Sequence, residues 1–115
     1  KLEEFIRKFV RFDLDMIVQY REIISVLFAE FYSLRVHLPL EVMQGLVDRH
    51  QAVIKEALAR CLDREPDDME HIVRILEGML GCYEAEILKL GLVLDEAELG
   101  KLSAIILRMV RAAVS

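Results

Sequence analysis

The hydrophobic positions of this chain recur every three or four residues along almost its whole length. Five such stretches follow one another, at 2–18, 21–35, 40–62, 68–90 and 96–114. This spacing is that of an amphipathic helix, and no segment shows the two-residue alternation typical of a strand. The pattern therefore predicts an all-α fold in which five helices form a single domain.

Residues that favour helix ends mark the predicted boundaries. Pro39 suits the first turn of the third helix, and Gly91 suits the C-terminal cap of the fourth. Two pairs with the spacing of a capping box open the fourth and fifth helices, Asp67 with Glu70 and Asp95 with Glu98. No Pro or Gly separates the first two stretches, but roughly 34 uninterrupted residues would exceed the usual helix length. We expect a bend or short turn near 19–21.

The last two stretches carry apolar residues on more than one face. A helix that is apolar all round must be covered all round, and a chain of 115 residues has few elements to do so. We therefore expect a homodimer, in which these two helices form a four-helix bundle with the partner subunit. The predicted dimerisation residues are Ile72, Ile75, Gly78, Met79, Cys82, Leu102, Ile105, Ile106, Met109 and Val110.

Small residues occupy one flank of the fourth stretch, at Gly78, Gly81 and Ala85. A glycine inside a helix lowers helix stability by about 1 kcal/mol relative to alanine. Two glycines three residues apart double this cost, which suggests that a packing requirement keeps them there. The flank predicts the close approach of another helix. The alternative is that these are surface glycines that the helix tolerates.

Composition and charge exclude several classes of protein. The chain is 55% hydrophobic with a net charge of −5, and its basic residues are dispersed among acids. Phosphate contacts supply most nucleic-acid affinity, so these residues alone are a poor DNA binder. No apolar run is long enough for a transmembrane span, and no signal peptide is visible. We expect a cytoplasmic protein that makes no contact with a membrane, and the start at Lys1 without Met indicates a piece of a longer one.

The residues that carry chemistry lack catalytic or metal-binding spacing. The residues three before the histidines include no glutamate, so a di-iron site of Glu-x-x-His pairs is not expected. Only four serines and no phosphate-binding glycine loop are present. Cys61 and Cys82 are expected to be reduced core thiols, with a disulfide or redox sensor as the alternative. We expect neither an enzyme nor a bound cofactor.

Aromatic and flexible apolar residues are concentrated in the first half of the chain. Such a set is typical of a plain core, and the alternative is a cavity for a small apolar or aromatic effector. The candidate ligand-binding residues are Phe9, Phe12, Met16, Tyr20, Phe28, Phe31, His50, Ile54, Met79 and Tyr83. His50 lies on an apolar stripe of the third stretch. This position is typical of a core histidine, and the alternative is a residue that contacts the ligand. Glu30 and Glu86 lie between apolar residues, where a buried acid is costly unless it is paired.

Four stretches together resemble the C-terminal regulatory domain of TetR-type transcriptional repressors. They are LEEFIRKFVRFDLDMIVQYREIISVLFAEF, LEVMQGLVDRHQAVIKEALARCL, MEHIVRILEGMLGCYEAEILKL and LGKLSAIILRMVRAAV. The resemblance covers essentially the whole chain but no invariant motif, and the helix-turn-helix of that family is absent. Where many members carry a Gly before the fourth of these helices, this chain has Asp63-Arg64-Glu65-Pro66.

The resemblance implies an effector-sensing and dimerisation domain. It places a ligand cavity among the first four helices and the dimer interface on the last two, and it implies that DNA is bound only by the absent N-terminal domain. A ligand that prefers one helix arrangement would then alter DNA binding. The alternative is a stand-alone helical module whose exposed apolar face binds a partner protein.

Overall fold

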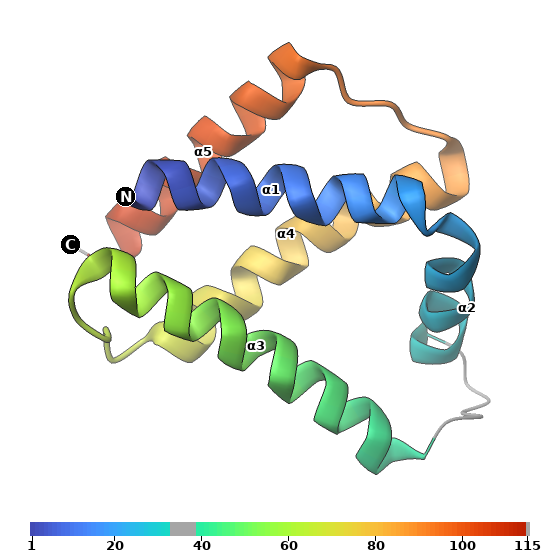
Figure 1. Cartoon of the computed structure of the whole chain (residues 1–115), viewed down its shortest axis with the longest axis horizontal. Helices are drawn as coiled ribbons and strands as arrows, with labels where there is room; N and C mark the ends of the chain where they lie inside the picture. The colour runs from blue at the N-terminus through green and yellow to red at the C-terminus, as the bar shows by residue number, and fades with distance from the viewer. Residues whose placement is uncertain (33–38, 115) are drawn as a thin grey trace.

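Helix α1 (Leu2–Gln19) is the helix around which the others pack. Its buried residues Ile6, Val10, Leu14 and Ile17 fall at intervals of three or four and form one apolar stripe. The computed structural model describes residues 1–32 and 39–114, and Figure 1 shows α1 crossing both α4 and α5. Contacts join α1 to each of the other four helices.

The described residues form five helices and contain no strand, which confirms the predicted all-α fold. After α1 come α2 (Arg21–Tyr32), α3 (Leu40–Leu62), α4 (Met69–Leu90) and α5 (Glu96–Val114). The expected turn between the first two stretches is confirmed at Tyr20, where φ is −113° and ψ is 35°. The second stretch was expected to reach residue 35, and its last part lies outside the described residues.

The helix ends agree with the sequence at three positions. Pro39 precedes α3 with φ −55°, and Gly91 ends α4 in the left-handed region with φ 69°. An L side chain rarely adopts that conformation, which explains why glycine stands there. Before α5, the backbone N–H of Glu98 donates to Asp95 Oδ1 over 2.8 Å.

The capping box predicted at Asp67 and Glu70 is wrong. Asp68 is the residue at the N-terminus of α4, and no side chain caps that end. The Glu70 carboxylate instead accepts a hydrogen bond from Lys55 Nζ of α3 at 3.0 Å. A partner on a neighbouring helix has replaced the local backbone interaction that the sequence spacing indicated.

The core is formed chiefly by facing stripes of α1, α4 and α5, with a smaller contribution from α3. Ile106 of α5, Leu80 of α4 and Leu58 of α3 are completely buried. Helices α4 and α5 contact each other less than each contacts α1. The sides of α4 and α5 that face away from α1 are therefore left largely uncovered within the protomer.

The small-residue flank of α4 faces open space in the protomer. A Cβ added at Gly78 or Gly81 would meet no heavy atom within 4 Å, apart from its own helix neighbourhood. The expected close approach of another helix therefore does not come from this chain. A helix of a partner remains a prediction.

The molecule is flat, with extents of 41 × 34 × 18 Å and a radius of gyration of 14.9 Å. Its shortest dimension is less than the width of two helices side by side, since a helix with side chains is about 10–12 Å across. A flat arrangement leaves a large part of each helix at the surface, and the chain exposes 8051 Å².

Candidate functional site

A cluster of polar side chains lies where α1, α3 and α4 meet. It comprises Asp13 of α1, His50 and Gln51 of α3, and Glu77 and Glu84 of α4. The two glutamates are seven residues apart, so they lie two helical turns from each other on one flank of α4. Each is half-buried, because that flank borders the apolar stripe that contains Leu80.

Burial and the neighbouring His50 have opposite effects on the pKa of Glu77. Its Oε1 atom is buried, accepts no hydrogen bond and lies 3.5 Å from His50 Nε2. Burial raises the pKa of Glu77, while His50 and a hydrogen bond from Gln51 lower it and the charge of Asp13 raises it again. The net direction is upward, since removing a carboxylate from water disfavours its charged form.

Glu84 is the most strongly perturbed acid of the cluster. Burial, a hydrogen bond with Asp13, the charge of Asp13 and the charge of Glu77 together raise the pKa of Glu84 to about 9. The Glu84 carboxyl is therefore protonated near neutral pH and can donate to the Asp13 carboxylate. The pair connects α1 to α4 through a shared proton, in the way that two close carboxyl groups avoid carrying two charges.

The structure distributes the candidate ligand residues over different environments. Ile54 belongs to the core, Phe9, Met79 and Tyr83 are half-buried, and Phe12, Met16 and Tyr20 are exposed. The rings of Phe9 and Phe5 stack at 5.7 Å with an interplanar angle of 16°. The side chains of Phe28 and Phe31 lie outside the described part of the structure. The half-buried aromatics of α1 and α4 therefore pack against the core, whereas Phe12 and Tyr20 are exposed.

Two expectations need correction, one about His50 and one about the cysteines, and the structure answers the open question of where Glu86 lies. His50 is not a core histidine, because its side chain is 52% exposed and faces Glu77. Glu86 is exposed at the surface of α4, while the side chain of Glu30 is not described. Cys82 is exposed and Cys61 is half-buried, so neither is a fully buried core thiol, and both are free.

Asp13, Glu77 and Glu84 were not among the residues predicted from the sequence. A signal was available for the two glutamates, because their positions continue the helical interval of Val73 and Leu80 and therefore border the buried stripe. No comparable signal marked Asp13. Its role depends on α4 crossing α1, which is a tertiary relationship.

The candidate dimerisation residues divide into two groups. Ile75, Gly78, Cys82, Ile105 and Met109 are exposed, and Met79 is half-buried. Four others are buried within the protomer, namely Ile72, Leu102, Ile106 and Val110. Ile106 in particular has no exposed surface left for a partner, so the structure assigns it to the protomer's own core.

Among the described residues, no group of three or more His, Cys, Asp or Glu side chains could hold a metal ion. Within the same residues, no helix combines the length and apolar character needed to cross a bilayer. Compared with known proteins, the chain matches no family model, no curated protein and no solved structure.

Proposed function

We propose that this chain is the effector-sensing and dimerisation part of a TetR-type transcriptional regulator. In this proposal two copies associate through α4 and α5, and a small apolar or aromatic effector binds among α1, α3 and α4. A helix-turn-helix domain outside these 115 residues would contact DNA. The proposal rests on the resemblance of the sequence and on the uncovered flanks of α4 and α5.

The observation that supports dimerisation most directly is the apolar surface facing away from α1. Ile75 of α4 is 57% exposed, and Ile105 and Met109 of α5 are 46% and 45% exposed. Ile105 and Met109 are one helical turn apart and form a continuous strip. The open flank of Gly78 on α4 would let a partner helix approach closely.

The exposed area supports the same proposal. A compact monomer of 13.3 kDa exposes about 6,450 Å², whereas this chain exposes 8051 Å². The excess of roughly 1,600 Å² per protomer matches what each subunit buries in a large, permanent dimer. The radius of gyration of 14.9 Å also exceeds the value of about 13 Å for a compact domain of this length.

The effector half of the proposal is supported by the junction of α1, α3 and α4. Phe9 of α1 and Tyr83 of α4 are half-buried and pack against the core. The cluster around Glu77 supplies polar groups from α1, α3 and α4. Binding sites for small molecules combine mostly apolar walls with a few polar groups that fix orientation. Because the junction involves three helices, a bound molecule would favour one helix arrangement over another.

Sedimentation equilibrium at micromolar concentrations tests the dimer. The expected mass is twice that of the 13.3 kDa chain, and a monomer throughout this range would overturn the proposal. A thermal-shift screen with hydrophobic and aromatic compounds tests the effector site, since a ligand of the native state raises the melting temperature. A dimer that no compound stabilises would favour the stand-alone interaction module.

A further inference from the structure

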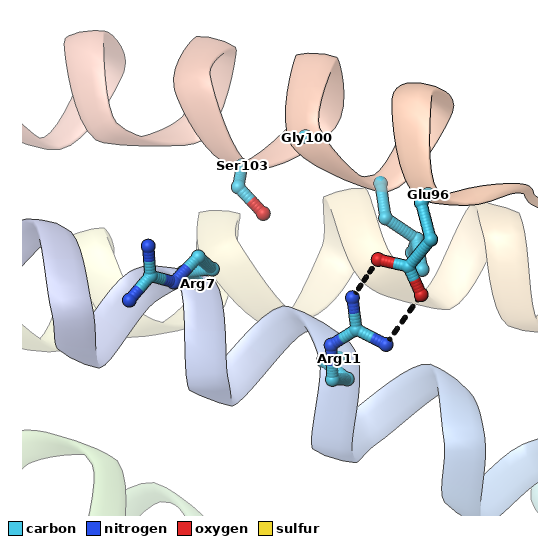
Figure 2. A pocket seen from close by; sticks show the side chains of 6 residues that line it. Arg7, Arg11, Glu96, Gly100 and Ser103 are labelled. Carbon is cyan, nitrogen blue, oxygen red and sulfur yellow. Dashed lines mark hydrogen bonds and ion pairs between the residues drawn. The ribbon is translucent and has the colours of Figure 1, made fainter.

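A polar cleft lies between α1 and α5, and its lining shares no residue with the cluster around Glu77. Figure 2 shows its lining, which consists of Arg7, Arg11, Glu96, Leu99, Gly100 and Ser103. The cleft has a volume of about 140 Å³. One water molecule needs about 10–15 Å³ of such space, so the cleft has room for a polyatomic ion.

Arg11 and Glu96 form one wall of this cleft and satisfy each other. Both guanidinium nitrogens of Arg11 donate to the Glu96 carboxylate, and the Nη1–Oε1 distance is 2.8 Å. The hydrogen bond from Arg11 lowers the pKa of Glu96, so that carboxylate is ionised. The positive charge of Arg11 is thereby offset, and an anion in the cleft would not have to displace Glu96.

Arg7 supplies a guanidinium group with no such partner. It lies one helical turn before Arg11 on the same side of α1, and it makes no hydrogen bond or ion pair with another described residue. Among the described residues its charged neighbour is Glu4, whose carboxylate pairs with Lys8. The net charge of the cleft lining is therefore +1, carried by Arg7.

Ser103 provides the second and independent feature. Its side chain is only 9% exposed, yet its hydroxyl makes no hydrogen bond with another described residue. Figure 2 shows this hydroxyl pointing from α5 across the cleft toward α1. The hydroxyl borders the cleft and is free to donate a hydrogen bond to a ligand there.

We propose that this cleft binds a small oxyanion, held by the guanidinium of Arg7 and the hydroxyl of Ser103. The planar fork of an arginine matches two oxygens of a carboxylate or phosphate group, and the hydroxyl adds a third donor from the opposite helix. The bound anion would bridge α1 and α5. This site is independent of the effector site and of the dimer flank proposed above.

An NMR titration of the whole chain tests the site, with sodium acetate and sodium phosphate as separate probes at constant ionic strength. At least one probe is expected to shift the backbone amides of Gly100 and Ser103 in a saturable manner, and the stronger probe identifies the preferred anion. Sodium chloride alone should leave them unchanged. Shifts that never saturate, or that chloride reproduces, would overturn the proposal.

Matched variants separate a built site from general attraction of anions. Arg7→Gln and Ser103→Ala should each weaken binding at least about tenfold, as expected when a hydrogen bond to a charged group is lost. Neither change threatens the fold, because Arg7 is exposed and the Ser103 hydroxyl has no partner to lose. Arg108→Gln on the exposed side of α5 is the control and should leave binding unchanged. Equal weakening in the control would contradict the assignment.

Discussion

The carboxyl group of Glu84 on α4 is hydrogen-bonded to that of Asp13 on α1. Burial and this hydrogen bond raise the pKa of Glu84 to about 9, so the pair holds one proton between two helices near neutral pH. The proton must leave if both groups are to be charged, and the two charges would then repel each other in a poorly hydrated place. The packing of α4 on α1 therefore depends on pH.

This relationship predicts that the chain loses stability as pH rises. The pKa of Glu84 in the folded chain lies above its ordinary value of 4.5, so the folded state binds more protons than the unfolded state. The stabilisation is complete below about pH 4.5 and is lost progressively up to about pH 9. We expect the free energy of unfolding to fall by roughly 2 kcal/mol between pH 5 and pH 8.5, less than the full pKa difference implies because Glu84 is partly hydrated.

The substitution Glu84→Gln should remove most of this pH dependence, because the amide cannot ionise. Urea unfolding at a series of pH values measures it, and Glu86→Gln on the exposed side of the same helix is the control. The pKa of Glu77 is raised as well. The free energy of unfolding of the Glu84→Gln variant should therefore still fall as pH rises, but by less than in the wild type. A wild-type slope that survives Glu84→Gln unchanged would show that other groups cause it.

The aspartates at the starts of α4 and α5 predict different results for the same kind of substitution. Asp95 Oδ1 accepts the N–H of Glu98 at 2.8 Å, so Asp95→Ala should destabilise the chain by about 1 kcal/mol. Asp68 makes no such bond at the start of α4, and Asp68→Ala should change stability by less than about half of that amount. Denaturant unfolding of both variants checks the contrast. Equal costs would mean that the side chain of Asp68 also acts as a cap.

Helix positions could be predicted from the sequence because they depend on local periodicity. The stretch 40–62 was predicted with the bounds that α3 shows, and the stretch 96–114 matches α5. Gly91 was predictable for a similar reason, since the left-handed conformation it adopts is a local property of one residue. These features need no knowledge of which helices are neighbours.

The polar sites could not be predicted in the same way, because they depend on the order in which helices pack. Glu70 had the spacing of a cap, but Lys55 on α3 is its partner. Asp13 joins Glu84 only because α1 crosses α4. The periodicity also left open which of two adjacent isoleucines of α5 faces the core, and the structure places Ile106 there and leaves Ile105 46% exposed.

That pair of isoleucines provides a test of which residues form the dimer interface. Ile106→Ala should lower the free energy of unfolding by about 2–5 kcal/mol, because it creates a cavity in the protomer's own core. Ile105→Ala should weaken dimerisation, and its effect on stability should therefore be largest at high protein concentration and shrink as dilution dissociates both proteins. Sedimentation and unfolding at several concentrations measure both effects. If Ile105→Ala leaves the dimer dissociation constant unchanged, α5 does not contribute this strip to the interface.

Gly45 of α3 and Gly78 of α4 both face open space in the protomer. Replacing each with alanine should give different results if α4 packs against a second copy. A Cβ at Gly45 of α3 or at Gly78 of α4 meets no heavy atom within 4 Å, so in an isolated protomer each change to alanine should stabilise its helix by about 1 kcal/mol. In the proposed dimer only Gly45→Ala keeps this gain. Gly78→Ala should raise the dimer dissociation constant about tenfold, since an extra methyl group in a close helix contact costs roughly 1–3 kcal/mol. Equal stabilisation by both variants, with the same dissociation constant, would show that no partner helix covers the Gly78 flank.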